Sequence, residues 1–511
     1  MFFMEKFYIT TPIYYINDKP HIGHAYTTIT ADVLANYNRL KGRDVYFLTG
    51  TDENSQKNIE AAKKFYKKED LSKDEIKKYL DGMAATWKAA WEKLKISNTD
   101  FVRTTEPRHI EAVQKFFKLV WDKGDIYKGF YEGYYCEACE EFKSEKDLVE
   151  GFCPIHKTAV KKIKEENYFF RLTKYREKLL KHIEKNPDFI MPESRKHEVI
   201  NYIKDFSSDI SITRESMKWG IEVPEMPGQV LYVWFDALIN YLSGIGFGEN
   251  NNPSSRKATK GANQFAKYWP ADLHLVGKDI IKFHCALWPA MLLSAGLPLP
   301  KQVFAHGFFT VAGEKMSKSL GNVVDPVAAA EKYGRDALRY YLLREISFGE
   351  DGDFSFARLE ERYNSDLVNG LGNLVARVFA LAEKHLEKMP KEKESYLEDF
   401  WKEYEKNICE LKLHTALTLI WEEISKCDII VDKEKPWELA STQKHGSKKT
   451  KKQEDEDREK LTKVLNDLLE RIRQIALALR PFLPETAEKI LNKFEGKEPL
   501  KGELLFPRLE K

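Results

Sequence analysis

Two short motifs in this 511-residue chain carry side chains suited to phosphate chemistry. The first, His21-Ile22-Gly23-His24, follows a strand-like run and precedes a helical pattern. A helix N-terminus attracts phosphate, Gly23 leaves room for a nucleotide, and two imidazoles add hydrogen-bond donors for phosphoryl oxygens. The second, Lys315-Met316-Ser317-Lys318-Ser319, carries two ammonium groups on a glycine-flanked segment that can close over β- and γ-phosphates. Together the motifs predict a nucleoside triphosphate site without a P-loop.

Each motif alone also has a plainer interpretation. His21 and His24 can be ordinary helix-capping histidines, and Lys315 and Lys318 can belong to an exposed, lysine-rich turn. The presence of both motifs, with the first placed correctly in an alternating strand and helix pattern, favours catalysis on a triphosphate.

The segments around the first motif are typical of a βαβ unit. Residues 7–16 predict a buried strand, residues 24–40 a helix, and residues 45–48 the next strand. Ligands of such sheets bind at the carboxyl ends of the strands. We therefore expect His21 and Asp52 to lie at the same edge of the sheet.

Residues 118–229 interrupt this alternation and are interpreted as an insertion. The alternating pattern resumes with the apolar runs at 231–235 and 274–277. From Leu359 onward, apolar positions at helical spacing predict an all-α bundle. The charge run 444–460 favours a solvated loop between two helices over RNA contact. The positions that define the two best helices are Leu367, Leu371, Leu374, Val375 and Val378, and Leu461, Val464, Leu465, Leu468, Leu469, Ile472 and Ile475.

The insertion contains four residues with metal-ligand spacing. Cys136 and Cys139 are followed after 13 residues by Cys153 and His156. Four such ligands suit tetrahedral Zn²⁺ with no position left for water, which predicts a structural site within about 130–165. The alternative is a set of reduced free cysteines.

The composition excludes several classes of protein. The chain has 82 basic and 80 acidic residues, a net charge of +2, so it has no global field for nucleic acid. It contains neither a long uncharged apolar run nor a signal-peptide pattern, and six cysteines do not make a disulfide framework. We expect a cytoplasmic protein with no membrane contact.

Seven segments, one of which is the second motif, carry a family resemblance. They are 10–15 (TTPIYY), 50–53 (GTDE), 232–237 (YVWFDA), 277–280 (GKDI), 283–284 (FH), 315–319 (KMSKS) and 434–437 (EKPW). With the first motif, they make the chain resemble class I aminoacyl-tRNA synthetases, most closely the bacterial-type methionyl-tRNA synthetases.

The resemblance implies an α/β fold. A Rossmann-like, parallel-sheet catalytic domain would be split by a zinc-binding connective insertion and followed by an all-α helical bundle. The implied segments are catalytic halves at 1–117 and 230–320, the insertion at 118–229, a stem-contact segment at 321–358, and an anticodon-binding bundle at 359–511.

The resemblance also implies roles for individual residues. Asp52 would bind the methionine ammonium, and the thioether pocket would hold a polarisable sulfur beside aromatic rings. ATP, with Mg²⁺, would contact Gly23, Gly277, Asp279, Lys315 and Lys318. The pocket would consist of Ile13, Tyr15, Trp234, Ala237, Leu238, Tyr241, Ile280 and His284, and the anticodon contacts would be Asn373, Arg377 and Trp437. Alternatives for Trp234 and Trp437 are a core aromatic and a ring packed at a helix start.

The implied activity is methionine–tRNA ligation: ATP and methionine form methionyl-adenylate, and the methionyl group then passes to initiator and elongator methionine tRNA. Three other interpretations remain: another class I synthetase such as the leucine or cysteine enzyme, a small-substrate nucleotidylyltransferase, and a catalytically silent tRNA- or zinc-binding paralogue. Asn54-Ser55 stands where the family commonly has His-Gly. Because the chain ends soon after the bundle, we expect a monomer or a subunit paired with a separate tRNA-binding chain.

Overall fold

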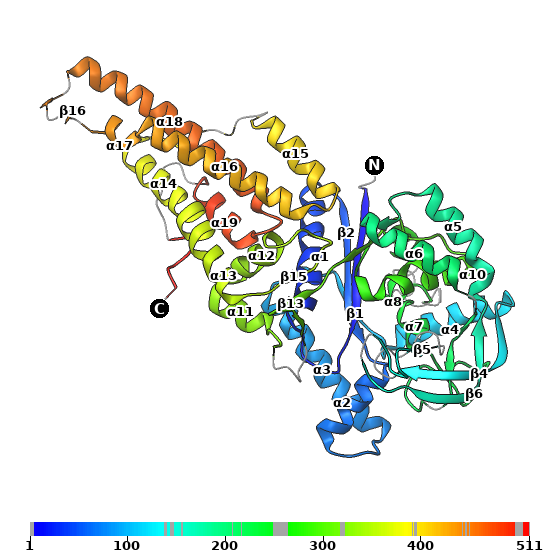
Figure 1. Ribbon diagram of the computed structural model, residues 1–511. Helices are drawn as coiled ribbons and strands as arrows, with labels where there is room; N and C mark the ends of the chain where they lie inside the picture. The colour runs from blue at the N-terminus through cyan, green and yellow to red at the C-terminus, as the bar shows by residue number, and fades with distance from the viewer. Residues whose placement is uncertain are drawn as a thin grey trace, which may run out of the picture. The chain divides into compact units, whose positions relative to one another are not determined.

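The computed structural model describes residues 5–509. It leaves out residues 137–140, 144–147, 155–156, 207, 216, 249–263, 317–321, 391, 393–395, 442, 445–446, 449 and 496–503. The chain divides into two compact units, Met1–Gly307 and Phe308–Lys511, which are described separately. Figure 1 gives the labels of the helices and strands.

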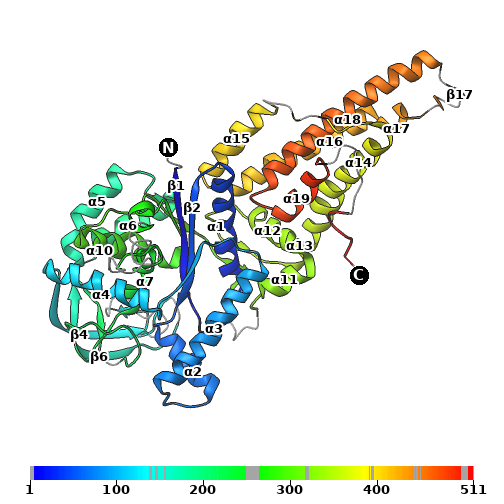
Figure 2. The same cartoon turned by 180° about the vertical axis from the view of Figure 1, so that it is seen from behind.

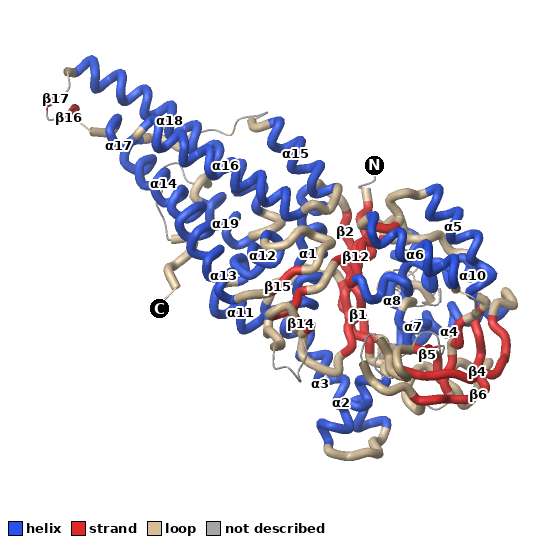
Figure 3. Tube along the Cα trace, in the orientation of Figure 1, coloured by secondary structure: helices blue, strands red, loops and turns tan. Residues whose placement is uncertain are grey.

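A parallel sheet forms the centre of the first unit. In the described part of this unit, six strands run in the order β3-β2-β1-β11-β12-β7. Figure 3 shows β1 and β2 side by side. The chain moves outward from β1 through β2 to β3, then returns to the other side of β1 with β11 and β12. The strand bounds are β1 (Lys6–Tyr15), β2 (Asp44–Asp52), β3 (Asp100–Arg103), β7 (Ile190–Met191), β11 (Leu273–Gly277) and β12 (Val303–His306).

Helix α1 (Ile22–Leu40) packs on β1 and β2 and is buried along most of its length. Two of its buried threonines donate within the helix: Thr28 to the His24 carbonyl at 2.9 Å and Thr30 to the Tyr26 carbonyl at 2.8 Å. These bonds let a polar sequence occupy the interior. The predicted strand–helix–strand unit is thus confirmed.

The core of the first unit combines sheet residues with aromatic side chains from the surrounding helices. In α4 (Pro107–Asp122), Val113, Phe116, Phe117 and Val120 recur at helical spacing and are all fully buried. The remaining helices are α2 (Gln56–Tyr66), α3 (Lys73–Lys93), α5 (Arg176–Lys185), α6 (Glu193–Asp205), α7 (Val233–Ala237), α8 (Asn240–Ser243) and α10 (Trp288–Ala295).

An antiparallel sheet interrupts the parallel fold within the predicted insertion. Strand β4 (Ile126–Cys136) pairs with β6 (Lys161–Phe170) over a long ladder, as Figure 2 shows from behind. The short strands are β5 (Glu141–Lys143), β8 (Ile210–Ser211), β9 (Thr213–Arg214) and β10 (Val230–Leu231). The apolar run 274–277 is a strand of the parallel sheet, as predicted. The run 231–235 is not, because the chain turns into α7 after Leu231.

The second unit is mainly helical. A small sheet joins β14 (Glu314–Lys315), β13 (Phe309–Val311) and β15 (Gly352–Asp353). The helices are α11 (Pro326–Tyr333), α12 (Arg335–Arg344), α13 (Phe356–Arg362), α14 (Asn373–His385), α15 (Glu398–Cys409), α16 (Leu413–Glu434), α17 (Pro436–Leu439), α18 (Lys451–Leu479) and α19 (Pro484–Asn492). A π-helical segment, Tyr363–Gly372, joins α13 to α14, and two short strands, Gln443–Lys444 and Ser447–Lys448, precede α18.

The apolar faces predicted for this unit are confirmed, since every residue that defined them is buried. The loop predicted for 444–460 is wrong from Lys451 onward, where α18 begins. Thr450 caps that helix and exchanges hydrogen bonds with Gln453, which lets a charged segment start a helix. Among the described helices of both units, none is long and apolar enough to cross a membrane.

Candidate functional site

The two histidines of the first motif form the start of α1. Nδ1 of His21 accepts the Gly23 backbone N–H at 3.0 Å, and Nδ1 of His24 accepts the His21 backbone N–H at 3.2 Å. The rings stack with centroids 3.7 Å apart. The capping interpretation is therefore correct, but it accounts for one nitrogen of each ring.

This capping geometry determines where each neutral imidazole carries its hydrogen. Because Nδ1 accepts a backbone N–H in both rings, the neutral tautomer has its hydrogen on Nε2. Burial, and then the neighbouring His21, lower the pKa of His24 well below its usual value. In its neutral form each ring therefore presents Nε2–H beside a helix N-terminus, an arrangement that suits phosphoryl oxygens.

Aromatic side chains hold His24 and the loop before it. The His24 ring centroid lies 5.0 Å from that of Tyr14 and 4.9 Å from that of Trp87. The Trp87 indole is fully buried in α3 and donates to the Asp18 carbonyl at 2.8 Å. Trp87 could not be predicted from the sequence, because a tryptophan on a distant helix gives no motif signal.

The sheet brings the ends of four strands to one edge. Tyr15 of β1 pairs with Asp52 of β2, and Gly277 of β11 pairs with His306 of β12. Strands β1 and β11 are adjacent, and the chain leaves them in opposite directions across the sheet. Such a switch point is where open α/β sheets bind ligands. Asp279 is exposed on the turn that follows β11.

His306 was also missed by the sequence analysis. Its Nδ1 lies 2.7 Å from the Gly307 carbonyl, which can only accept, so Nδ1 carries the hydrogen. Its Nε2 therefore accepts the Thr27 hydroxyl of α1, at 2.7 Å. This bond connects β12 to the helix that carries the two capping histidines.

Asp52 lies in a buried turn at the end of β2 and is only 4% exposed. Asn58 Nδ2 donates to the Asp52 carbonyl at 2.8 Å, and the Asn54 N–H donates to Oδ1 at 3.2 Å. The neighbouring Glu53 forms a bidentate ion pair with Arg103, at 2.7 and 2.9 Å. Arg103 therefore balances the charge of Glu53 within this turn.

The predicted thioether pocket contains a buried tyrosine–histidine pair. His284 Nδ1 lies 2.9 Å from the Ile280 carbonyl, and its Nε2 lies 2.7 Å from the Tyr241 hydroxyl. The carbonyl accepts the Nδ1 hydrogen, so Nε2 accepts from Tyr241. Burial lowers the pKa of His284 to about 4, so the imidazole is neutral at physiological pH. In this state the Tyr241 hydrogen is already directed at His284.

Trp234 differs from an ordinary core aromatic. Its ring stacks on Phe283 with centroids 4.0 Å apart and planes within 5°. The Trp234 side chain is only partly buried, and its indole N–H has no hydrogen-bond partner within the described residues. Ala237 and Leu238 beside it are buried, and Ile13, Tyr15 and Ile280 are partly buried against the same core. Phe283 was missed as a pocket residue, although it directly precedes His284.

The lysine motif belongs to the second unit. Lys315 ends β14, paired with Thr310 of β13, and Gly313 occupies the turn before it with φ of +76°. The Asp353 carboxylate accepts the Gly313 N–H at 2.9 Å, which holds this turn. Lys318 lies outside the described residues. The approach of the two ammonium groups to a triphosphate stays a prediction.

Two of the four predicted metal ligands are described, and both are fully buried. Cys136 ends β4, where its Sγ lies 3.8 Å from the Thr158 hydroxyl. The Cys153 N–H donates to the Thr158 carbonyl at 3.0 Å. Cys139 and His156 lie outside the described residues, and within the described ones no cluster of three metal-binding side chains occurs. Two buried thiols around one threonine are donors that suit Zn²⁺.

The predicted anticodon residues lie together in the second unit. Asn373 and Arg377 occupy successive turns of α14, Asn373 being exposed. The Arg377 guanidinium carbon lies 5.7 Å from the Trp437 ring centroid. Trp437 is 44% exposed at the start of α17, so it is not a ring packed away at a helix start.

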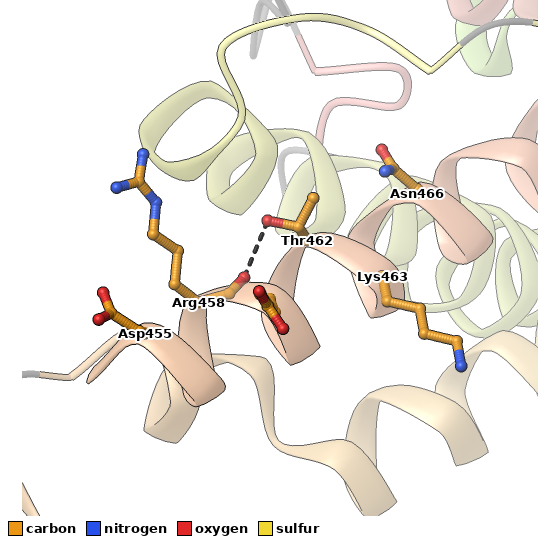
Figure 4. Close-up of a pocket in the computed structure, with 6 residues that line it drawn as sticks. Asp455, Arg458, Thr462, Lys463 and Asn466 are labelled. Carbon is orange, nitrogen blue, oxygen red and sulfur yellow. Dashed lines mark hydrogen bonds between the residues drawn. The ribbon is translucent and has the colours of Figure 1, made fainter. Parts of the chain in front are cut away.

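A cavity of about 800 Å³ opens along one polar face of α18 (Figure 4). Its lining residues have mixed charge and include none of the predicted site residues: Asp455, Arg458, Glu459, Thr462, Lys463 and Asn466. The Thr462 hydroxyl donates to the Arg458 carbonyl at 2.8 Å, a contact within the helix. We assign no function to this cavity.

Comparison with known proteins agrees with this geometry. The family model of class I tRNA synthetases (M) matches residues 7–162 and 144–379. The methionine–tRNA ligase of Thermotoga maritima is 44% identical over 507 residues, covering 96% of this chain and 76% of that protein. The Bacillus subtilis methionine–tRNA ligase is 42% identical over 548 residues, covering 99% and 78%. Mycobacterium tuberculosis methionyl-tRNA synthetase in complex with methionyl-adenylate is 38% identical with a TM-score of 0.88, covering 99% of this chain and all of that chain.

The parallel sheet, its switch point and the capping histidines therefore define a class I tRNA synthetase. The chain belongs, within that class, to the methionine–tRNA ligase family.

Proposed function

We propose that this methionine–tRNA ligase activates methionine at the carboxyl edge of β1, β2 and β11. The proposal rests on one observation: Asp52 at the end of β2 pairs with Tyr15 at the end of β1, the histidine pair starts the helix that follows β1, and His284, which contacts Tyr241, follows β11. A carboxylate for the amino group, donors for the phosphate and an aromatic slot for the side chain are what adenylation of methionine needs.

The activation step transfers an adenylyl group without an enzyme nucleophile. A methionine carboxylate oxygen attacks the α-phosphorus of ATP, the bond to the bridging oxygen breaks, and pyrophosphate leaves with its electrons. His21 and His24 donate Nε2–H to oxygens on which charge grows. Lys315 and Lys318 neutralise the leaving pyrophosphate, Gly277 and Asp279 contact the nucleoside, and Mg²⁺ accompanies ATP as part of the substrate.

The amino acid is held at two points. Asp52 accepts a charge-assisted hydrogen bond from the methionine ammonium. The thioether lies among Ile13, Trp234 and the Tyr241–His284 pair, where an apolar, polarisable sulfur gains from aromatic edges. Ala237, Leu238, Ile280 and Tyr15 complete the pocket.

In the second step the methionyl group passes to tRNA, which the second unit binds. A ribose hydroxyl at the 3′ end of tRNA, the 2′-hydroxyl by family resemblance, attacks the methionyl carbonyl carbon. The bond from this carbon to the AMP phosphate oxygen breaks, AMP leaves, and the hydroxyl proton passes to the leaving phosphate. Trp437 stacks on an anticodon base while Asn373 and Arg377 bind base edges, since amide and guanidinium groups suit single-stranded RNA. The segments 321–358 and 359–511 contact the tRNA stem and the anticodon.

The metal site has a structural role. Cys136, Cys139, Cys153 and His156 would hold one Zn²⁺, which would supply folding energy to the segment around residues 130–165. The protein is cytoplasmic, and acts as a monomer or with a separate tRNA-binding chain.

The test is ATP–pyrophosphate exchange with purified protein across a panel of amino acids, with zinc content measured in parallel. We expect exchange with methionine and about one zinc per chain. Exchange that follows leucine or cysteine instead, or no exchange at all, would overturn the assignment of the site.

A further inference from the structure

Asn54 joins two parts of the proposed methionine site. It is 4% exposed and lies in the turn between β2 and α2. Its backbone N–H donates to Asp52 Oδ1 at 3.2 Å, and its side-chain Nδ2 donates to Asp236 Oδ2 at 3.1 Å. Asp52 would bind the ammonium group, whereas Asp236 lies in α7 between Trp234 and Ala237, which would bind the side chain.

The turn that carries Asn54 is held firmly on its other sides. The Trp219 indole N–H donates to the Glu53 carbonyl at 3.0 Å, and the Glu53 N–H donates to the Thr104 hydroxyl at 2.8 Å. Ser55 caps α2 by accepting the Asn58 N–H at 3.3 Å. Because these contacts fix the backbone, the Asn54 amide projects toward α7 from a rigid base.

The Asn54 amide provides a hydrogen-bond donor to the Asp236 carboxylate. Asp236 is fully buried, and a buried carboxylate needs hydrogen-bond donors. His109, on α4, lies 2.9 Å from the Ser243 hydroxyl of α8. Helix α8 is thus tied to α4 through this side-chain contact, and α7 is tied to the turn after β2 through the Asn54 side chain.

We propose that Asn54 is a positioning residue for methionine activation. It sets the distance between Asp52 and the pocket on α7, so that one amino acid can reach both at once. The inference rests on the proposed roles of Asp52 and Trp234. Loss of the amide therefore weakens methionine binding while leaving ATP binding, at the ends of β1 and β11, unchanged.

The decisive variants first remove the hydrogen-bond donor at position 54 and then restore a donor at position 236. Asn54→Asp has nearly the same shape but cannot donate when ionised, so it sets two carboxylates against each other. We expect the KM for methionine in exchange to rise about 10- to 100-fold, as for a lost bond to a charged group. The KM for ATP should not change. In the double variant N54D/D236N the donor is restored from the other side, and the KM for methionine should return most of the way.

A matched control separates positioning from general damage. Asn38 is likewise buried and donates to the Leu34 carbonyl at 2.8 Å. It lies near the end of α1, whereas the histidine pair lies at the start of that helix. Asn38→Ala should lower the melting temperature without splitting the two KM values. If Asn54→Asp does not fold, Asn54→Ala, which also removes the donor to Asp236, takes its place in the measurement of the two KM values.

The outcomes distinguish this inference from the site assignment. Asp52→Asn and Trp234→Ala are measured in parallel. If neither raises the KM for methionine, the proposed site is wrong. If both do, but Asn54→Asp leaves the KM unchanged, raises both KM values equally, or is not rescued by D236N, then Asn54 is not a positioning residue.

Discussion

Replacing Trp437 with alanine should separate the two reactions of this enzyme. The Trp437 ring is 44% exposed and lies 5.7 Å from the Arg377 guanidinium carbon. An exposed aromatic face beside a cation is a platform on which a splayed base can stack. We therefore expect Trp437→Ala to weaken tRNA recognition and to leave methionine activation intact.

The size of the effect follows from the stacking that is lost. Removal of one stacked base–aromatic contact costs about 1–3 kcal/mol. Since 1.4 kcal/mol corresponds to a tenfold change, kcat/KM for tRNA should fall by about 5- to 150-fold. The stability loss should be small, because Trp437 is 44% exposed and an exposed site seldom costs more than about 0.5 kcal/mol.

The assay compares aminoacylation of methionine tRNA with methionine-dependent pyrophosphate exchange on the same preparations. Phe65→Ala is the control, because Phe65 is an exposed aromatic residue, 68% exposed, on α2 of the first unit and outside the segments assigned to tRNA. Trp437→Phe keeps an aromatic face and should lose less activity than Trp437→Ala.

Equal losses in aminoacylation and exchange would refute the reasoning, because Asp52, the histidine pair and the methionine pocket lie in the other unit. Unchanged aminoacylation by Trp437→Ala would also refute it, since no base would then stack on this ring.

Three further outcomes follow from the first unit. His24→Ala should slow exchange by about 10²- to 10³-fold, as expected for one lost transition-state donor, and an unchanged rate would exclude His24 from catalysis. Burial holds the pKa of His284 at about 4, against about 6.5 when exposed, so the unfolded chain binds more protons between these values. Stability should therefore rise with pH by up to about 3 kcal/mol across that window, and urea unfolding of His284→Gln should show a shallower rise. Cys136→Ser should release zinc and expose the insertion to proteolysis without abolishing exchange, whereas a zinc-free wild type by metal analysis would contradict the site.

The elements that carry local periodicity could be predicted from the sequence. The strand before His21, the helix after it and the apolar faces of α14 and α18 were confirmed, because alternating and helical patterns reflect which face of an element is buried. The errors arose where the local signal was ambiguous. The apolar run 231–235 looks like a strand, but the backbone turns into α7, and the charged segment after Thr450 looks like a loop, but a capping box starts a helix there.

Sequence by itself determined the residue types available for chemistry: paired histidines, paired lysines, a cysteine cluster and the motifs of the family. Tertiary structure decided their states. The hydrogens of His21 and His24 lie on Nε2 because backbone N–H groups occupy Nδ1, and His284 is neutral because burial disfavours its charged form. Contacts such as Asn54 with Asp236 join residues 182 positions apart, and no local pattern encodes them because the packing of the whole unit creates them.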